Sequence, residues 1–204
     1  HVDVFRLTPA QFREDVRRSK AQLEQLTGQA VRGYRAPDFS IVKSSLWAFD
    51  VLAEEGFAYD ASVNPAGLAR FGVPDFPAQP VRLELSGGRT LVELPVATLR
   101  ALGRNLPVAG GGYHRLLPFS AIRWAIERTV LVGDVFVAYC HPYEFDPDEF
   151  AHLDLPLPLK TRLHQGLGRR GFEGKFRRML REFETQLAAD VAARPDWPAQ
   201  ALGG

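Results

Sequence analysis

The sequence contains a single cysteine, Cys140, and its acidic and basic side chains nearly balance. One cysteine excludes an internal disulfide and any metal cluster built from cysteines. With 25 Lys and Arg against 24 Asp and Glu, the formal net charge is +1, so electrostatics predicts neither a nucleic acid nor an anionic membrane as partner. No apolar run is long enough to cross a bilayer, because the best candidate, Thr129 to Cys140, is interrupted by Gly133-Asp134.

The chain starts with His1 rather than Met, in the middle of a sequence pattern. We therefore expect an N-terminal segment to be missing, together with any targeting signal that it carries. The cysteine content fits a reducing compartment, which favours a cytoplasmic location, with the periplasm as the alternative.

The first third of the chain alternates predicted helices and strands. Thr8, Pro9 and Gln11 form a helix start resembling a capping box, and Gly28 is a natural helix end. A strand enters the stretch 31–40, a second helix begins at Ser44 or Ser45 and ends at Gly56, and a strand covers Phe57 to Asp60. This rhythm is typical of a parallel α/β fold.

The length of the chain is that of one domain of ordinary size. After its first third, the sequence predicts both helices and strands, connected by loops. The three glycines at 110–112 lack the setting of a nucleotide-binding motif and indicate a loop whose backbone packs close to another group. The predicted elements are a hairpin over 81–95, a loop over 106–118, helices over 119–132 and 172–191, a strand over 135–140, and a frayed tail over 194–204.

Charged or titratable side chains stand at three predicted strand ends: Arg35, Asp60 and His141. In α/β barrels the C-terminal strand ends carry the chemistry. The charge of Arg35 needs a carboxylate partner or a polar cleft. The alternative to a functional role for Arg35 is a structural ion pair. A histidine at a strand end suits a general acid or base, and a hydrogen-bonded packing residue is the alternative for His141. Their shared placement, together with His1, favours a functional site.

The other histidines, His114, His152 and His164, have no comparable setting and are interpreted as surface or loop residues. No G-x-S-x-G motif is present, and Cys140 lies in a predicted strand where a buried thiol is inert, so a serine or cysteine nucleophile is not expected. A weaker alternative is a sugar hydrolase that uses Asp60 with Glu144 or Asp146 as paired carboxylates.

Several blocks, in order, resemble those of a known family. They read V-F-R-L-T-P-A-Q-F after His1, then G-Y-R-A-P-D-F-S, E-E-G-F-A-Y-D-A-S-V-N-P, P-V-A-G-G-G-Y-H-R-L-L-P and F-V-A-Y-C-H-P-Y-E-F-D-P. The chain resembles the NodB-homology polysaccharide deacetylases, or carbohydrate esterase family four. The resemblance is greatest to the branch found in bacterial exopolysaccharide and exosortase gene clusters, which carries its own C-terminal extension.

The resemblance implies a distorted (β/α) barrel of the polysaccharide deacetylase type, without its N-terminal strand region. Residues 1–154 would form the deacetylase domain and residues 155–204 the family-specific helical extension and tail. The family's upstream aspartate pair and the first histidine of its metal motif have no counterpart in this sequence. A fragment without them is expected to bind metal poorly and to be inactive alone.

The resemblance also implies a role for each site residue. His1 matches the second histidine of the H-x-x-x-H metal motif. Arg35 matches the arginine of R-x-P, which holds the base carboxylate, and Asp38 occupies the position whose backbone N–H stabilises the oxyanion. Asp60 falls in the motif that lines the groove and orients the histidine, and His141 matches the general acid.

The implied function is a metal-dependent hydrolase that removes N-acetyl groups from an N-acetylated polysaccharide or oligosaccharide in exopolysaccharide biosynthesis. Its cofactor would be a divalent metal ion, zinc in many members of the family. A barrel that binds carbohydrate without catalysis is the alternative from a different class. The balanced charge predicts no nucleic-acid partner, the lack of a long apolar run predicts no membrane span, and the oligomeric state is left open.

Overall fold

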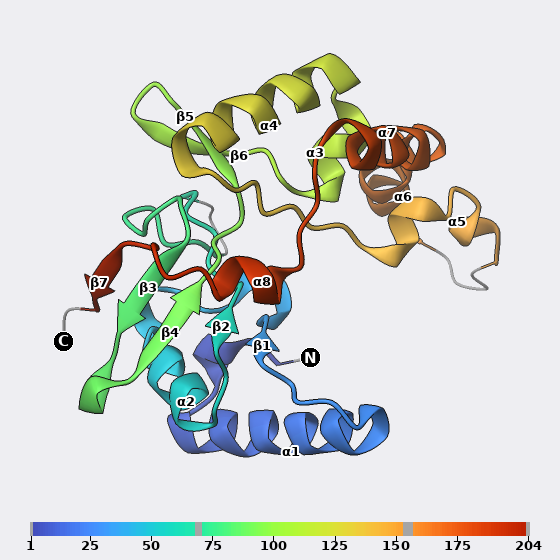
Figure 1. Cartoon of the computed structure of the whole chain (residues 1–204). Coiled ribbons are helices and arrows are strands. Elements are labelled where there is room, and N and C mark those ends of the chain that lie inside the picture. Colours follow the sequence, from blue (N-terminus) through green and yellow to red (C-terminus); the bar gives the residue numbers. More distant parts are fainter. Residues whose placement is uncertain (1, 68–70, 153–156, 203–204) are drawn as a thin grey trace.

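The computed structural model describes residues 2–67, 71–152 and 157–202, and its centre is a five-stranded sheet in the order β1-β2-β4-β3-β7 (Figure 1). The pairs β1–β2, β2–β4 and β3–β7 are parallel, and β3–β4 is antiparallel. The strands of this sheet are β1 Gly33–Tyr34, β2 Tyr59–Asp60, β3 Val81–Glu84, β4 Thr90–Glu93 and β7 Ala199–Ala201. The predicted α/β class is confirmed, and within the described ranges the sheet is open, with β1 and β7 at its edges.

Helices α1 (Pro9–Thr27) and α2 (Ala48–Glu54) pack together on one side of the sheet (Figure 1). The predicted start of α1 is confirmed, because the Thr8 side chain accepts a hydrogen bond from the Gln11 N–H. The predicted end is confirmed too, since Gly28 closes the helix at φ 68°, a conformation that glycine adopts without strain. The buried side chains of α1, Phe12 among them, join those of α2 in the main hydrophobic core.

The predicted hairpin is formed by β3 and β4, which are joined by the short 3₁₀ helix η4 (Ser86–Gly88). A second, separate hairpin is formed by β5 (Thr98–Ala101) and β6 (Arg104–Pro107). The remaining 3₁₀ helices are η1 Val4–Arg6, η2 Pro37–Phe39, η3 Lys43–Ser45 and η5 Pro142–Phe145.

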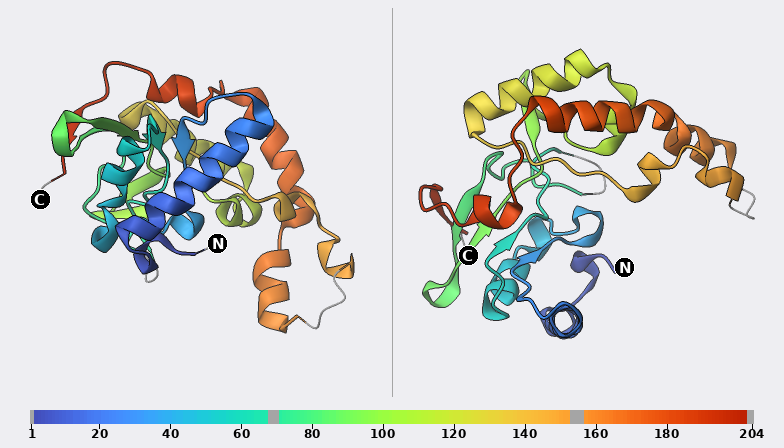
Figure 2. Two further views of the ribbon diagram at one scale, coloured as in Figure 1. Left: turned by 90° about the horizontal axis from the view of Figure 1, so that it is seen from below. Right: turned by 45° about the vertical axis from the view of Figure 1, so that its right-hand side comes forward.

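A group of helices from the second half of the chain lies on the other side of the molecule from α1 (Figure 2). Helices α4 and α7 are neighbours, since Arg123 pairs with Glu182 at 3.6 Å and the Arg178 guanidinium lies over the Phe119 ring at 4.1 Å. The helices of this half are α3 Gly111–Leu116, α4 Phe119–Gly133, α5 Glu149–His152, α6 Leu159–Gly166, α7 Arg169–Glu182 and α8 Ala188–Ala192. No helix in the described ranges is long and apolar enough to cross a membrane.

Two predicted elements in this half are wrong in detail. The stretch 135–140 is extended but forms only one isolated bridge, between Gly110 and Tyr139, because its N–H and C=O groups bond to single residues of two different segments. The predicted helix over 172–191 is two helices, α7 and α8. It breaks at Phe183, which is extended at φ −122°.

The loop predicted over 106–118 contains the helix α3 instead. Its glycines do pack closely, as expected: a Cβ on Gly110 would collide with the Tyr139 ring, and one on Gly111 with the Glu144 carboxylate. His114 is buried rather than exposed, with Nε2 3.0 Å from the Val108 carbonyl oxygen, and burial lowers the pKa of its imidazole.

The tail predicted to fray is ordered up to residue 202. The Trp197 indole is buried and donates to the Val191 carbonyl at 2.7 Å, and β7 then pairs with β3. The predicted boundary between residues 154 and 155 lies outside the described residues and stays a prediction, as does the placement of the last two residues of the tail.

Candidate functional site

Arg35 directly follows β1 and extends from the edge of the sheet. Its Nε donates to the Ala61 carbonyl at 3.0 Å, and its guanidinium lies 5.8 Å from the centre of the Phe39 ring. Among the described residues no carboxylate forms a salt bridge with Arg35. The structural ion pair, which was the plain alternative for this residue, is therefore absent from that part of the chain, and the exposed guanidinium can meet a further partner.

The turn after Arg35 has an unusual backbone. Asp38 and Phe39 both lie in the left-handed region at φ 53°, a backbone conformation that residues other than glycine rarely adopt. The Ala36 N–H donates to the Ser62 hydroxyl at 2.7 Å and ties the turn to the segment after β2. Strained turns of this kind persist where the surroundings fix them, and they gather at functional sites.

Asp60 ends β2 and is fully buried. Its carboxylate accepts the Ser62 N–H at 3.0 Å and the Ser62 hydroxyl at 2.7 Å. Its neighbour across the parallel ladder is Glu93, the last residue of β4, which is also fully buried. Two carboxyl groups thus face each other at the ends of adjacent strands.

The surroundings of the two carboxyls favour their neutral forms. Burial raises the pKa of both, and the charge of Asp60 raises the pKa of Glu93 further, well above its usual value. The Val63 N–H, which donates to Glu93 Oε1 at 2.8 Å, and the positive charge of Arg35 oppose this rise. Glu93 Oε2 has no hydrogen-bond partner among the described residues, which also disfavours an ionised Glu93.

Sequence reasoning missed Glu93. The available signal was a carboxylate inside the apolar run L-V-E-L, where an ionised side chain is costly to bury without a partner. The partner could not be identified from the sequence, because it depends on the register that places β4 beside β2.

The Asp60–Glu93 pair predicts an unusual dependence of stability on pH. Since the folded state raises the pKa of Glu93, the free energy of unfolding that this pair contributes is fully present at low pH, below the ordinary carboxyl pKa. It is lost as the pH rises through the folded pKa. Glu93→Gln keeps an acceptor for Val63 and gives Asp60 a permanent donor. We expect the free energy of unfolding of this variant not to fall as the pH rises through that range. At pH 8 the variant should be at least as stable as the parent protein.

Urea unfolding at a series of pH values checks this, with Glu93→Ala as the matched control. The alanine variant leaves the Val63 N–H without its acceptor and should lose about 2 kcal/mol. If Glu93→Gln were as destabilised as Glu93→Ala and followed the parent's dependence of stability on pH, the raised pKa of Glu93 would be contradicted.

His141 follows the extended stretch 135–140 and is exposed. Its N–H donates to Glu144 Oε2 at 2.9 Å, and the Glu144 N–H donates back to the His141 carbonyl at 3.0 Å. The imidazole stacks on the Tyr143 ring at 5.1 Å and meets the edge of the Tyr139 ring at 5.9 Å. The histidine is thus held from its backbone, and its ring remains accessible.

Glu144 is itself fixed by a buried ion pair. Its Oε1 lies 3.0 Å from Arg115 Nε, and the two side chains are 1% and 4% exposed. Arg115 also donates to the carbonyls of Gln165 and Leu167, so its charge is well surrounded by acceptors. Glu144 and Asp60 are both buried and engaged with other groups. Neither can reach a glycosidic bond as the sugar-hydrolase alternative requires.

An aromatic group connects Arg35 with His141. The Arg35 guanidinium lies over Phe39, the Phe39 ring meets the Tyr139 ring at 4.7 Å, and Tyr139 contacts His141. The hydrogen bonds of the Asp60 carboxylate go to Ser62 and do not include His141. Burial raises the pKa of the half-buried Cys140 thiol beside it, which fits an inert cysteine.

The predicted metal ligand His1 lies outside the described residues. Within the described part of the chain, no three His, Cys, Asp or Glu side chains gather in a way that could hold a metal ion. The described donors therefore do not fit a complete metal site.

Comparisons with known proteins show a family from one source and a fold from another. No curated protein matches the chain significantly. A solved structure described as a "putative polysaccharide deacetylase" from Mycobacterium smegmatis is similar over 98% of this chain, with 22% identity and a TM-score of 0.50. This chain covers 56% of the length of that one, and the likeness shows the shared fold. The family model described as "Domain of unknown function (DUF3473)" matches residues 61–193, and the chain belongs to this family.

Proposed function

We propose that this protein is a hydrolase that removes N-acetyl groups from an N-acetylated polysaccharide or oligosaccharide, in bacterial exopolysaccharide biosynthesis. The observation that carries the proposal is an accessible histidine, His141, held by a buried ion pair and joined through packed aromatic rings to Arg35. The likeness of the fold to a protein described as a polysaccharide deacetylase supports the same reading.

The roles follow from accessibility and charge. His141 would protonate the leaving amine, since its ring is exposed and its position is fixed from the backbone. Arg35 would hold a carboxylate that acts as base, because its own hydrogen bond goes to a carbonyl and leaves its remaining donors available. The left-handed turn at Asp38 would present backbone N–H groups to a developing oxyanion.

Asp60 would act indirectly, as a positioning residue. Its hydrogen bonds to Ser62 fix the hydroxyl that accepts the Ala36 N–H, and so it supports the turn that follows Arg35. This differs from direct orientation of the histidine, because the contacts of Asp60 lead toward Arg35 rather than His141.

A divalent metal ion, zinc by the family resemblance, is part of the proposal. It would supply Lewis-acid activation of the acetamide carbonyl and of a water molecule. His1 is the residue of this sequence proposed to hold it. The described residues do not complete a ligand set, so we assign no step of the reaction to the ion.

The proposal is tested by measuring acetate released from an N-acetylated polysaccharide by the full-length protein. We expect release to stop when a chelator removes divalent ions and to return when zinc is added back. Release that continues unchanged after chelation and dialysis would rule out the metal. The absence of any release, with the polysaccharide still bound, would favour the non-catalytic carbohydrate-binding alternative.

A further inference from the structure

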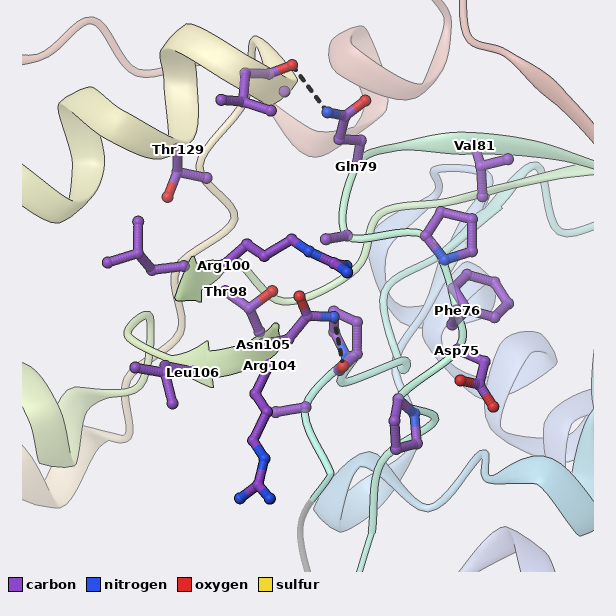
Figure 3. Close-up of a pocket in the computed structure, with 18 of the residues that line it drawn as sticks. Asp75, Phe76, Gln79, Val81, Thr98, Arg100, Arg104, Asn105, Leu106 and Thr129 are labelled. Carbon is purple, nitrogen blue, oxygen red and sulfur yellow. Dashed lines mark hydrogen bonds between the residues drawn. The ribbon is translucent and has the colours of Figure 1, made fainter. Parts of the chain in front are cut away.

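A cavity of about 1270 Å³ lies away from the candidate site, and none of Arg35, Asp60 and His141 lines it (Figure 3). One wall is the β5–β6 hairpin, and another is the segment 74–81 that leads into β3. The C-terminal turn of α4 and the residues entering β7 complete the walls. Segments far apart in the sequence therefore meet around one space.

Side-chain hydrogen bonds hold these walls together. Gln79 Nε2 donates to the Val132 carbonyl at 2.8 Å and joins the segment before β3 to α4. Asn105 Nδ2 donates to the Pro65 carbonyl at 2.9 Å and joins the hairpin to the loop after β2 (Figure 3). The cavity is thus formed before any ligand arrives, as is usual for binding sites.

Positive charge predominates in the lining. Arg100, Arg104 and Arg128 line the cavity, whereas Asp75 is the single acidic side chain among its lining residues. Within the described ranges of the chain, no side-chain hydrogen bond or ion pair is formed by any of the three guanidinium groups. Figure 3 shows Arg100 extending from the hairpin toward the segment that carries Gln79. Unpaired guanidinium groups around a cavity attract anions and can bind carboxylates through two parallel hydrogen bonds.

Two buried polar atoms on the hairpin wall also lack partners. The Thr98 side chain belongs to a residue that is 5% exposed, and its hydroxyl finds no hydrogen bond among the described residues; the same is true of Asn105 Oδ1. Figure 3 shows both side chains on the hairpin beside Arg100 and Arg104. Buried polar groups are nearly always paired, so unpaired ones at a cavity wall point to a ligand that carries hydroxyl groups.

We propose that this cavity binds a segment of an acidic polysaccharide, with carboxylates on the arginines and sugar hydroxyls on Thr98 and Asn105. The volume exceeds that needed for a small ligand and suits several sugar rings. A single-stranded nucleic acid is disfavoured, since such ligands stack on exposed aromatic rings and the one aromatic residue of the lining, Phe76, is buried. The proposal rests on the proposed function only in that the ligand is a polysaccharide.

The test is calorimetric titration of the full-length protein with a short oligogalacturonate, which carries carboxylates and no N-acetyl group. Binding should weaken as salt is added, and a neutral cello-oligosaccharide of the same length should bind at least about tenfold more weakly. The double variant Arg100→Ser/Arg104→Ser should weaken oligogalacturonate binding by about tenfold or more. The matched control Arg162→Ser/Arg170→Ser removes the same charge from exposed helix positions and should change nothing.

Thr98→Val separates a binding role from a structural one. Because the hydroxyl has no described partner, its removal should leave the melting temperature unchanged or raise it, while the affinity for oligogalacturonate falls several-fold. Equal affinity for the neutral and acidic sugars, tighter binding of polyphosphate, or undiminished binding by the arginine variant would each overturn the proposal. Since oligogalacturonate cannot be deacetylated, this result is independent of any acetate release.

Discussion

Glu144→Ala is expected to destabilise the protein by about 3–5 kcal/mol, because it leaves the Arg115 guanidinium buried without its carboxylate. Arg115 would keep its bonds to the carbonyls of Gln165 and Leu167. Arg115 Nε and the His141 N–H would both lose their acceptor, so the cost combines a buried charge left without its counter-charge and two unmade hydrogen bonds. Urea unfolding monitored by circular dichroism measures it.

The matched control is the exposed pair Arg123–Glu127, whose carboxylate lies 2.8 Å from the arginine on one face of α4. Glu127→Ala should cost at most about 1 kcal/mol, since solvent screens an exposed pair. Gly111→Ala should resemble Glu144→Ala, because the added Cβ would collide with the Glu144 carboxylate. Equal small costs for Glu144→Ala and Glu127→Ala would show that the buried pair does not support this part of the fold.

His141→Ala is expected to lower acetate release by the full-length protein about 10²- to 10⁴-fold, the usual contribution of a general acid. Stability should hardly change, because the imidazole is exposed and the backbone contacts with Glu144 do not need it. The rate of acetate release under saturating substrate measures the effect, and urea unfolding checks that the fold is intact.

His152→Ala provides the comparison for that experiment. His152 is an exposed histidine at the end of α5 and is not one of the residues assigned to the site, so its replacement should leave the rate unchanged. A His141→Ala variant that retained most of the parent rate would remove His141 from the reaction. Proton transfer would then have to come from another group.

Local signals in the sequence were sufficient for the first half of the fold. The cap at Thr8, the helix end at Gly28 and the turn at η4 depend on neighbouring residues alone, and all three are confirmed. The prediction of a strand over 135–140 was wrong, because a preference for extended backbone does not specify which strand would pair with it. Its Val137 carbonyl accepts from Ala97 and its Tyr139 N–H donates to Ala109, so no continuous ladder forms.

The prediction of a frayed C-terminal tail was wrong for a related reason. Nothing local in residues 194–202 predicts order, but β3 presents an unpaired edge and Trp197 has a buried position beside Val191, so the tail docks there. The positions of Arg35 and His141 at the ends of extended stretches could be found from the sequence, because each lies just before a proline. Glu93 and Arg115 could not, because their importance comes from partners that only the tertiary fold brings near.

The most direct test of the account is the mass of a defined N-acetylated oligosaccharide after incubation with the full-length protein. N-deacetylation predicts products that have lost acetyl groups, carry free amines and keep the original number of sugar rings. Products with fewer rings and all their acetyl groups would contradict the account and indicate glycosidic cleavage. An unchanged mass, under conditions where the oligosaccharide is shown to bind, would equally contradict it.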